Sequence, residues 1–113
     1  MHELALTHSI VEIVLERAQI EGLRTVTRVV LEVGAAAGVD AEALRFCFDA
    51  VTHDTPAQGA QLAIEAIPLR AMCRECGDEF QPESLIADCP RCHGYAPRVV
   101  AGQELRVKEF VGS

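Results

Sequence analysis

The chain has 113 residues, half of them hydrophobic and 24% charged, which is an ordinary globular composition. Its formal net charge is −7. A nucleic-acid-binding protein needs a surplus of Lys and Arg to displace counterions from phosphates. The charge therefore argues against a nucleic-acid partner, and equally against an anionic membrane surface. Proteins and cations are the expected partners.

The N-terminus begins Met1-His2-Glu3-Leu4 and lacks the basic and apolar regions of a secretory signal. No apolar run approaches the ~18 residues that cross a membrane. We therefore expect a cytoplasmic protein that starts at its own first residue. In reducing cytosol, paired cysteines bind metal more often than they form disulfides.

The hydrophobic pattern predicts two helices. In the first, apolar residues recur every four positions, which predicts an amphipathic helix of about five turns that ends near Gly22. Its apolar stripe consists of Leu6, Ile10, Val14 and Ala18. The second helix is expected to begin at Asp40, whose carboxylate can accept hydrogen bonds from the first turn, and to end before Pro56.

Three segments have the alternation of β-strands: residues 25–33, 61–67 and 103–111. Between residues 71 and 97 the chain has too few large apolar side chains to form a core of its own. We therefore predict an α+β fold, in which two helices pack on a small three-stranded sheet and a zinc-ribbon-like domain with four cysteines is inserted. The predicted domains are an α+β domain of residues 1–70 plus 98–113, and residues 71–97, inserted before the last strand.

The inserted segment contains two Cys-x2-Cys pairs separated by twelve residues: Cys73, Cys76, Cys89 and Cys92. Two residues between thiolates let both sulfurs of a turn face one ion, and two such turns complete a tetrahedral zinc site. Four protein ligands leave no open position, so we expect the zinc to be structural. The alternatives are two disulfides, a redox-active dithiol, or iron in place of zinc. Gly77 and Gly94 follow the two turns, where positive φ is often required.

His2 is a candidate ligand for a second metal. The free N-terminal amine, the amide nitrogen of His2 and its imidazole Nδ1 can close one five-membered and one six-membered chelate ring. Three nitrogens in a plane suit a tetragonal Ni(II) or Cu(II) ion and leave one position open, so the metal can be passed on. Glu3, a partner's residue or water can supply the fourth donor. The alternative is that His2 has no ligand role.

Four short motifs occur in order along the chain: Met1-His2-Glu3-Leu4, Leu31-Glu32-Val33-Gly34, Leu44-Arg45-Phe46-Cys47-Phe48 and Cys89-Pro90-Arg91-Cys92-His93-Gly94. Together they resemble the HypA/HybF family, and the resemblance runs nearly end to end. It implies a nickel metallochaperone that matures [NiFe]-hydrogenase, and in some organisms urease.

The resemblance also implies specific sites and partners. Nickel is expected at Met1, His2 and Glu3, and zinc at the four cysteines. The implied partners are a HypB-type GTPase and the maturation machinery of the hydrogenase large subunit, and some members form homodimers. Some relatives have an acidic residue near nickel where this chain has Asp40, although helix capping already explains this residue. Some also carry a histidine after both cysteine pairs, whereas here only His93 is available, so we expect a stable four-thiolate site.

The family is not enzymatic, and the sequence offers no nucleophile–base pair or phosphate-binding loop. Two other classes of function remain as alternatives. A zinc-ribbon protein-interaction module without metal transport would tolerate the loss of His2. A thiol-redox enzyme would need cysteines that cycle in the absence of zinc.

Overall fold

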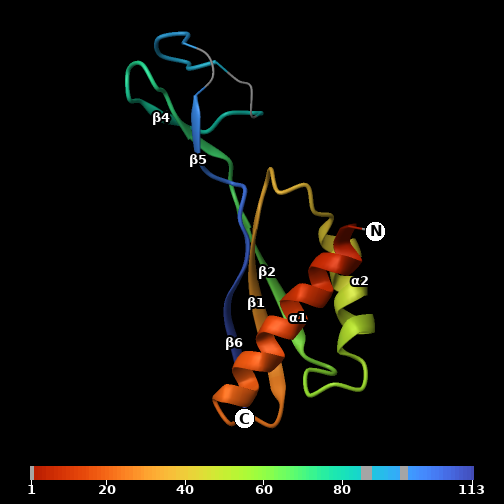
Figure 1. The fold of residues 1–113 in the computed structure, drawn as a ribbon. Helices are drawn as coiled ribbons and strands as arrows, with labels where there is room; N and C mark the ends of the chain where they lie inside the picture. The colour runs from red at the N-terminus through yellow and green to blue at the C-terminus, as the bar shows by residue number, and fades with distance from the viewer. Residues whose placement is uncertain (1, 85–87, 95–96) are drawn as a thin grey trace. The chain divides into compact units, whose positions relative to one another are not determined.

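The computed structural model describes residues 2–84, 88–94 and 97–113, and for His2 the backbone alone. The helices and strands, in chain order, are α1 (His2–Ile20), β1 (Val26–Gly34), α2 (Ala41–Thr52), β2 (Gln61–Ile67), β3 (Arg70–Met72), β4 (Glu79–Phe80), β5 (Arg98–Ala101) and β6 (Leu105–Gly112) (Figure 1). This arrangement confirms the predicted α+β class.

The chain forms two compact units. The helical unit comprises Met1–Glu32, Val39–Glu65 and Arg106–Ser113, and the cysteine unit comprises Val33–Gly38 and Ala66–Leu105. The domain boundaries predicted from the sequence, with residues 71–97 as an insert, stay a prediction.

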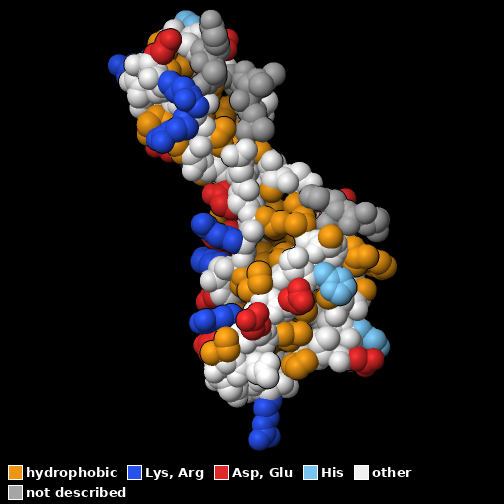
Figure 2. Space-filling model, in the orientation of Figure 1, with side chains coloured by type: hydrophobic (Ala, Val, Ile, Leu, Met, Phe, Trp, Pro, Cys, Tyr) orange, Lys and Arg blue, Asp and Glu red, His pale blue; other side chains and the backbone are white. Residues whose placement is uncertain are grey.

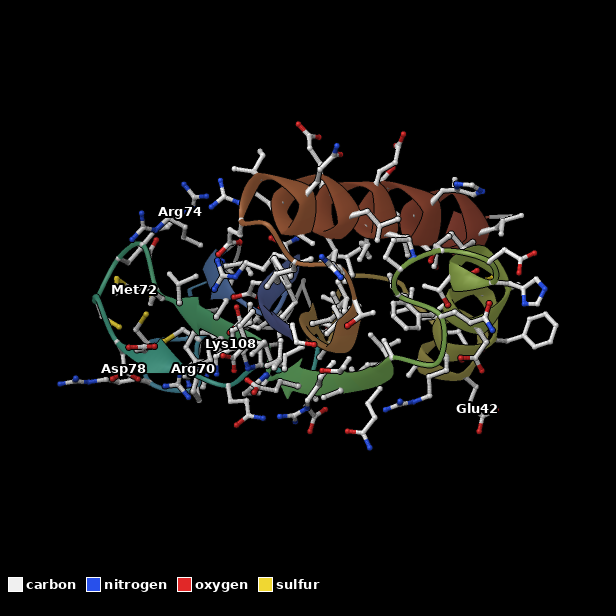
Figure 3. All side chains as sticks on the ribbon, turned by 90° about the horizontal axis from the view of Figure 1, so that it is seen from below. Glu42, Arg70, Met72, Arg74, Asp78 and Lys108 are labelled. Atoms are coloured by element: carbon white, nitrogen blue, oxygen red, sulfur yellow. The ribbon has the colours of Figure 1, made fainter. Side chains whose placement is uncertain are left out.

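In the helical unit, α1 and α2 lie side by side, and α1 covers one face of the sheet (Figures 1 and 3). The predicted cap of α2 is confirmed: Asp40 Oδ1 accepts hydrogen bonds from the amides of Glu42 at 2.9 Å and Ala43 at 3.4 Å. These bonds satisfy amides that have no partner inside the helix. Among the described residues, no helix combines the length and apolar character needed to cross a bilayer.

The larger sheet has the order β2-β1-β6. Strand β6 runs antiparallel to β1, because the amide of Gly34 donates to Glu104 O and the amide of Ser113 donates to Thr25 O. Strand β2 has the same direction as β1, with α2 as the crossover between them. Strand β1 is therefore the central strand, paired with β2 on one side and β6 on the other.

The core of the helical unit is aliphatic apart from one phenylalanine, and it draws on α1, β1 and α2. Its members include Ile10, Val14, Ala18, Val29, Leu31, Leu44 and Phe48. Across the sheet, Arg106 Nε contacts Glu32 Oε1 at 2.5 Å and Lys108 Nζ contacts Glu65 Oε1 at 3.1 Å. The hydrogen bond that Lys108 donates to the Glu65 carboxylate raises the pKa of Lys108. Such exposed pairs add little to stability, so the buried apolar side chains provide most of the stability of the unit.

The cysteine unit contains a second sheet, with the order β4-β3-β5. Both neighbours of β3 are antiparallel to it, and the fully buried Ala71 lies opposite Phe80 on one side and Val99 on the other. The sequence pattern did not predict these strands, because segments of two to four residues are too short to show alternation.

At two glycines in the cysteine unit, one backbone segment passes directly against another. The Ala36 amide donates to Gly102 O at 2.7 Å, which brings that carbonyl against Gly34. A Cβ at Gly34 would overlap the Gly102 carbonyl, and a Cβ at Gly102, whose φ is +106°, would lie 2.5 Å from Leu69 Cα. Both positions therefore require glycine, because the atoms in the way belong to the backbone.

We expect Gly34→Ala to lower the free energy of unfolding by about 3 kcal/mol, the upper part of the range for overpacking, because backbone atoms must move apart. Gly38→Ala is the matched control in the same segment. Gly38 has open space around it but a φ of +73°, so its replacement should cost about 1–2 kcal/mol through strain alone. Denaturant unfolding of both variants tests this, and equal losses would contradict the steric argument.

Candidate metal centres

The first cysteine turn is closed by two backbone hydrogen bonds. The Gly77 amide donates to Cys73 O at 3.1 Å, and the Cys73 amide donates to Asp78 O at 2.8 Å. The Cys76 amide lies 3.5 Å from the Cys73 sulfur. Gly77 has a φ of +75°, as expected for the residue that follows the second cysteine.

The second turn repeats this pattern. The His93 amide donates to Cys89 O at 2.9 Å, and the Cys89 amide donates to Gly94 O at 2.8 Å. The prediction of positive φ at Gly94 is wrong: His93 adopts it, at +62°, because His93 is the residue that directly follows the second cysteine. A Cβ at Gly94 would lie 2.6 Å from Glu75 Oε2, a contact that the flexible Glu75 side chain can relieve by moving.

The two turns bring four sulfur atoms together. The sulfurs of Cys73, Cys76, Cys89 and Cys92 all lie within 4.8 Å of one another. Two of the separations are 3.4 Å, from Cys73 to Cys92, and 3.7 Å, from Cys76 to Cys89. A zinc tetrathiolate with Zn–S of about 2.3 Å has sulfur–sulfur edges of about 3.8 Å, so the cluster fits zinc.

The cluster excludes the alternative of two disulfides, and its ligands are four sulfurs without a histidine nitrogen. The four thiols are free and lie much farther apart than the ~2.05 Å of a disulfide. Among the described residues, the cluster contains four cysteines and does not include His93. Two of the sulfurs, those of Cys73 and Cys89, belong to buried residues, whereas Cys76 and Cys92 are exposed.

The thiols differ strongly in acidity. The amides of Cys76 and Glu75 point at the Cys73 sulfur and lower its pKa to about 6. At Cys92 the Gly94 amide lowers the pKa, but the neighbouring sulfurs, first that of Cys73, and desolvation together raise it to about 12. One thiolate is thus stabilised by amides, and further ionisation is opposed by like charge. Four thiolates coexist around a cation, whose binding must release the remaining protons.

The N-terminal candidate site is described in part. Met1 and the side chain of His2 lie outside the described residues. Glu3 Oε2 accepts a hydrogen bond from the Asp40 amide at 3.4 Å. This contact places the first turn of α1 beside the first turn of α2, in keeping with the resemblance, which puts an acidic residue at position 40 near nickel. It brings the Glu3 carboxylate to the backbone of Asp40, and the resemblance associates both residues with nickel.

Comparisons with known proteins identify the chain. Residues 1–111 match a family model described as hydrogenase/urease nickel incorporation, metallochaperone, HypA. The chain belongs to the HypA family. It is 48% identical over 110 residues to the hydrogenase maturation factor HypA of Geobacter metallireducens, covering 97% of each chain. It is 42% identical, with the same coverage, to that of Chlorobaculum parvum.

Two solved structures of HypA proteins have the same fold. One is a solution structure of a HypA protein, with a TM-score of 0.78 and 23% identity, covering 100% of this chain and 97% of that one. The other is the Ni metallochaperone HypA from Helicobacter pylori, with a TM-score of 0.71 and 20% identity, covering 97% and 96%. As a HypA-family metallochaperone for hydrogenase maturation, the chain acts by binding metal and not by catalysis.

We expect Cys76→Ser to lose zinc and to unfold the cysteine unit, because binding of a structural zinc contributes about 10–16 kcal/mol. Cys47→Ala is the matched control, since Cys47 is a buried free cysteine of α2 outside the cluster. Elemental analysis and amide hydrogen exchange of β3 and β5 measure both effects. A Cys76→Ser variant that keeps zinc and protected amides would contradict the assignment.

Zinc affinity should fall on acidification, because protons compete with the ion for the sulfurs. The dependence should steepen below pH 6, because Cys73, with a pKa of about 6, must then lose a proton as well. Competition with a chelator at pH values from 8 to 5 measures this. An affinity that does not change over this range would show that the ligands are not thiols that ionise on binding.

Proposed function

We propose that the chain carries Ni(II) at its N-terminus and delivers it for the maturation of [NiFe]-hydrogenase. The proposed ligands are the Met1 amine, the His2 amide nitrogen and imidazole, and the Glu3 carboxylate. The observation that supports this site most directly is the contact from Glu3 to the Asp40 amide, within a chain of the HypA family.

The start of α1 at His2 suits chelation. The first four amides of a helix have no partner inside it, so the His2 nitrogen is not committed to a helical hydrogen bond. Together with the amine and Nδ1 it supplies three nitrogens in a plane, the geometry that Ni(II) accepts. The fourth position, which the Glu3 carboxylate takes in the free chain, can be given up to a partner's ligand before the three nitrogens leave.

Glu3 and Asp40 have supporting roles in this proposal. The contact at 3.4 Å holds the first turn of α1 against the start of α2. Asp40 keeps its cap on α2, and both carboxylates lower the cost of bringing a dication to the site. Because the amine and imidazole bind in their neutral forms, nickel affinity falls as protons are added.

The proposal assigns zinc to Cys73, Cys76, Cys89 and Cys92, in an inserted domain of residues 71–97. Four sulfur ligands close the coordination shell, so this ion is structural and takes no part in transfer. Its role is to hold a segment with little apolar core. Zinc is preferred to iron because it needs no redox partner, although both accept four thiolates.

The partners follow from this function. Membership of the HypA family connects the chain to the hydrogenase maturation machinery. Within it we infer a HypB-type GTPase as the direct partner, with urease and a homodimer as further inferences. Cytoplasmic location belongs to the same proposal, because both the partners and the free thiols require it.

The decisive experiment compares untagged wild type with His2→Ala by nickel titration calorimetry and elemental analysis. We expect nickel to bind to the wild type and not to the variant, because the variant lacks the imidazole. Zinc should be retained in both, because the cysteines are unchanged. Glu3→Gln and Glu3→Ala form a matched pair, since glutamine keeps the acceptor for the Asp40 amide but removes the charge.

Equal nickel binding by wild type and His2→Ala, with zinc in both, would overturn the N-terminal site. The chain would then be better described as a zinc-stabilised interaction module. An extra residue before Met1 provides an independent check, because it displaces the amine and should weaken nickel binding without affecting zinc.

A further inference from the structure

Phe46 lies on the outward side of α2 with 76% of its surface exposed. Its neighbours Leu44, Cys47 and Phe48 are buried, so the helix is well packed on its other side. Burying a phenylalanine is strongly favourable, and aromatic side chains are enriched at the centres of protein interfaces. The structural core does not account for Phe46.

The residues around Phe46 are acidic. Glu42 and Asp49, four positions before it and three after it, lie on the same face of the helix and are exposed. Figure 3 shows Glu42 pointing away from the helices. The nearby Arg45 is directed elsewhere, because its Nη1 donates to Leu62 O at 2.6 Å. An apolar side chain with acidic neighbours resembles the centre and rim of a protein interface.

Charge selects among the occupants of this face. From Asp40 to Asp54 the chain has four acidic residues (Asp40, Glu42, Asp49, Asp54) and one basic residue (Arg45), a net charge of −3. Two copies of this face would repel each other, as would nucleic acid or an anionic membrane. Figure 2 shows hydrophobic and acidic side chains side by side over α1 and α2. The complementary partner is a protein with an apolar pocket bordered by Lys and Arg.

We propose that this face of α2, centred on Phe46 with Glu42 and Asp49 at its rim, is the docking site of the protein that exchanges nickel with the chain. The proposal rests on the proposed function, because it takes its partner from nickel delivery. Phe46 follows Asp40 by six residues, about 9 Å along a helix. A protein interface of ordinary size, about 800 Å² on each partner, extends farther than this distance, so a partner centred on Phe46 can reach the end of α2 at which Asp40 contacts Glu3.

The test measures the affinity of the untagged, zinc-loaded chain for its HypB-type GTPase by calorimetry. Phe46→Ser should weaken binding at least tenfold, the effect of removing a central interface residue. Ile20→Ser is the matched control, since Ile20 is 67% exposed at the far end of α1, and it should leave the affinity unchanged. Glu42→Lys should slow association and reduce its salt dependence, because it reverses a rim charge.

Unchanged affinity of Phe46→Ser would overturn the proposal, as would a wild-type chain that does not bind the GTPase. A wild-type dimer that Phe46→Ser dissociates in sedimentation would also overturn it and make the face a self-interface. Nickel titration of Phe46→Ser separates this inference from the proposed function. Nickel binding equal to wild type with lost docking supports both, whereas no nickel binding in any variant counts against the proposed function alone.

Discussion

Four sulfur atoms within 4.8 Å of one another impose the constraint on which the cysteine unit depends. Four thiolates this close repel one another, and the pKa values of the thiols reflect this. Backbone amides stabilise the first thiolate, and its negative charge then opposes ionisation of the next thiol. A divalent cation at the centre removes this repulsion and ties two turns, thirteen residues apart from Cys76 to Cys89, to one point. The short strands β3, β4 and β5 are then ordered around the turns, although they bury few large side chains.

The helical unit is held in a different way. Its core combines α1, α2 and the central strand β1, and the Asp40 side chain caps the N-terminus of α2. Asp40 takes part in both the fold and the candidate nickel site. Its carboxylate caps α2, while its amide donates to Glu3 and thereby positions the first turn of α1. In the proposed nickel site, Asp40 would therefore combine its structural role with a position beside the ligands.

Much of this architecture is predictable from the sequence, and the failures have physical causes. The periodic apolar residues of α1 and the alternation of the three longer strands extend over enough residues to define their elements. Strands β3 to β5 are too short for that, and their order comes from the cysteine turns and from pairing distant in sequence. The spacing of the cysteines predicts that the sulfurs converge, because each turn is local. The contact of Glu3 with Asp40 depends on the packing of two helices, which no local pattern specifies. Phe46 belongs to the motif Leu44-Arg45-Phe46-Cys47-Phe48, but the motif does not say which of its side chains point outward. The structure shows this, because Leu44 and Phe48 are buried and Phe46 is exposed.

The unequal exposure of the four cysteines has a consequence for the lifetime of the zinc site. Cys73 and Cys89 are buried, whereas Cys76 and Cys92 face solvent. An oxidant or a competing thiol therefore reaches one sulfur of each turn, and once that sulfur is oxidised it no longer binds the ion. Under oxidative stress the ion would be lost through the exposed sulfurs first, and the cysteine unit would stay unfolded until those sulfurs are reduced and zinc rebinds. The persistence of this module in the cell is thus governed by redox kinetics as well as by the equilibrium affinity for zinc.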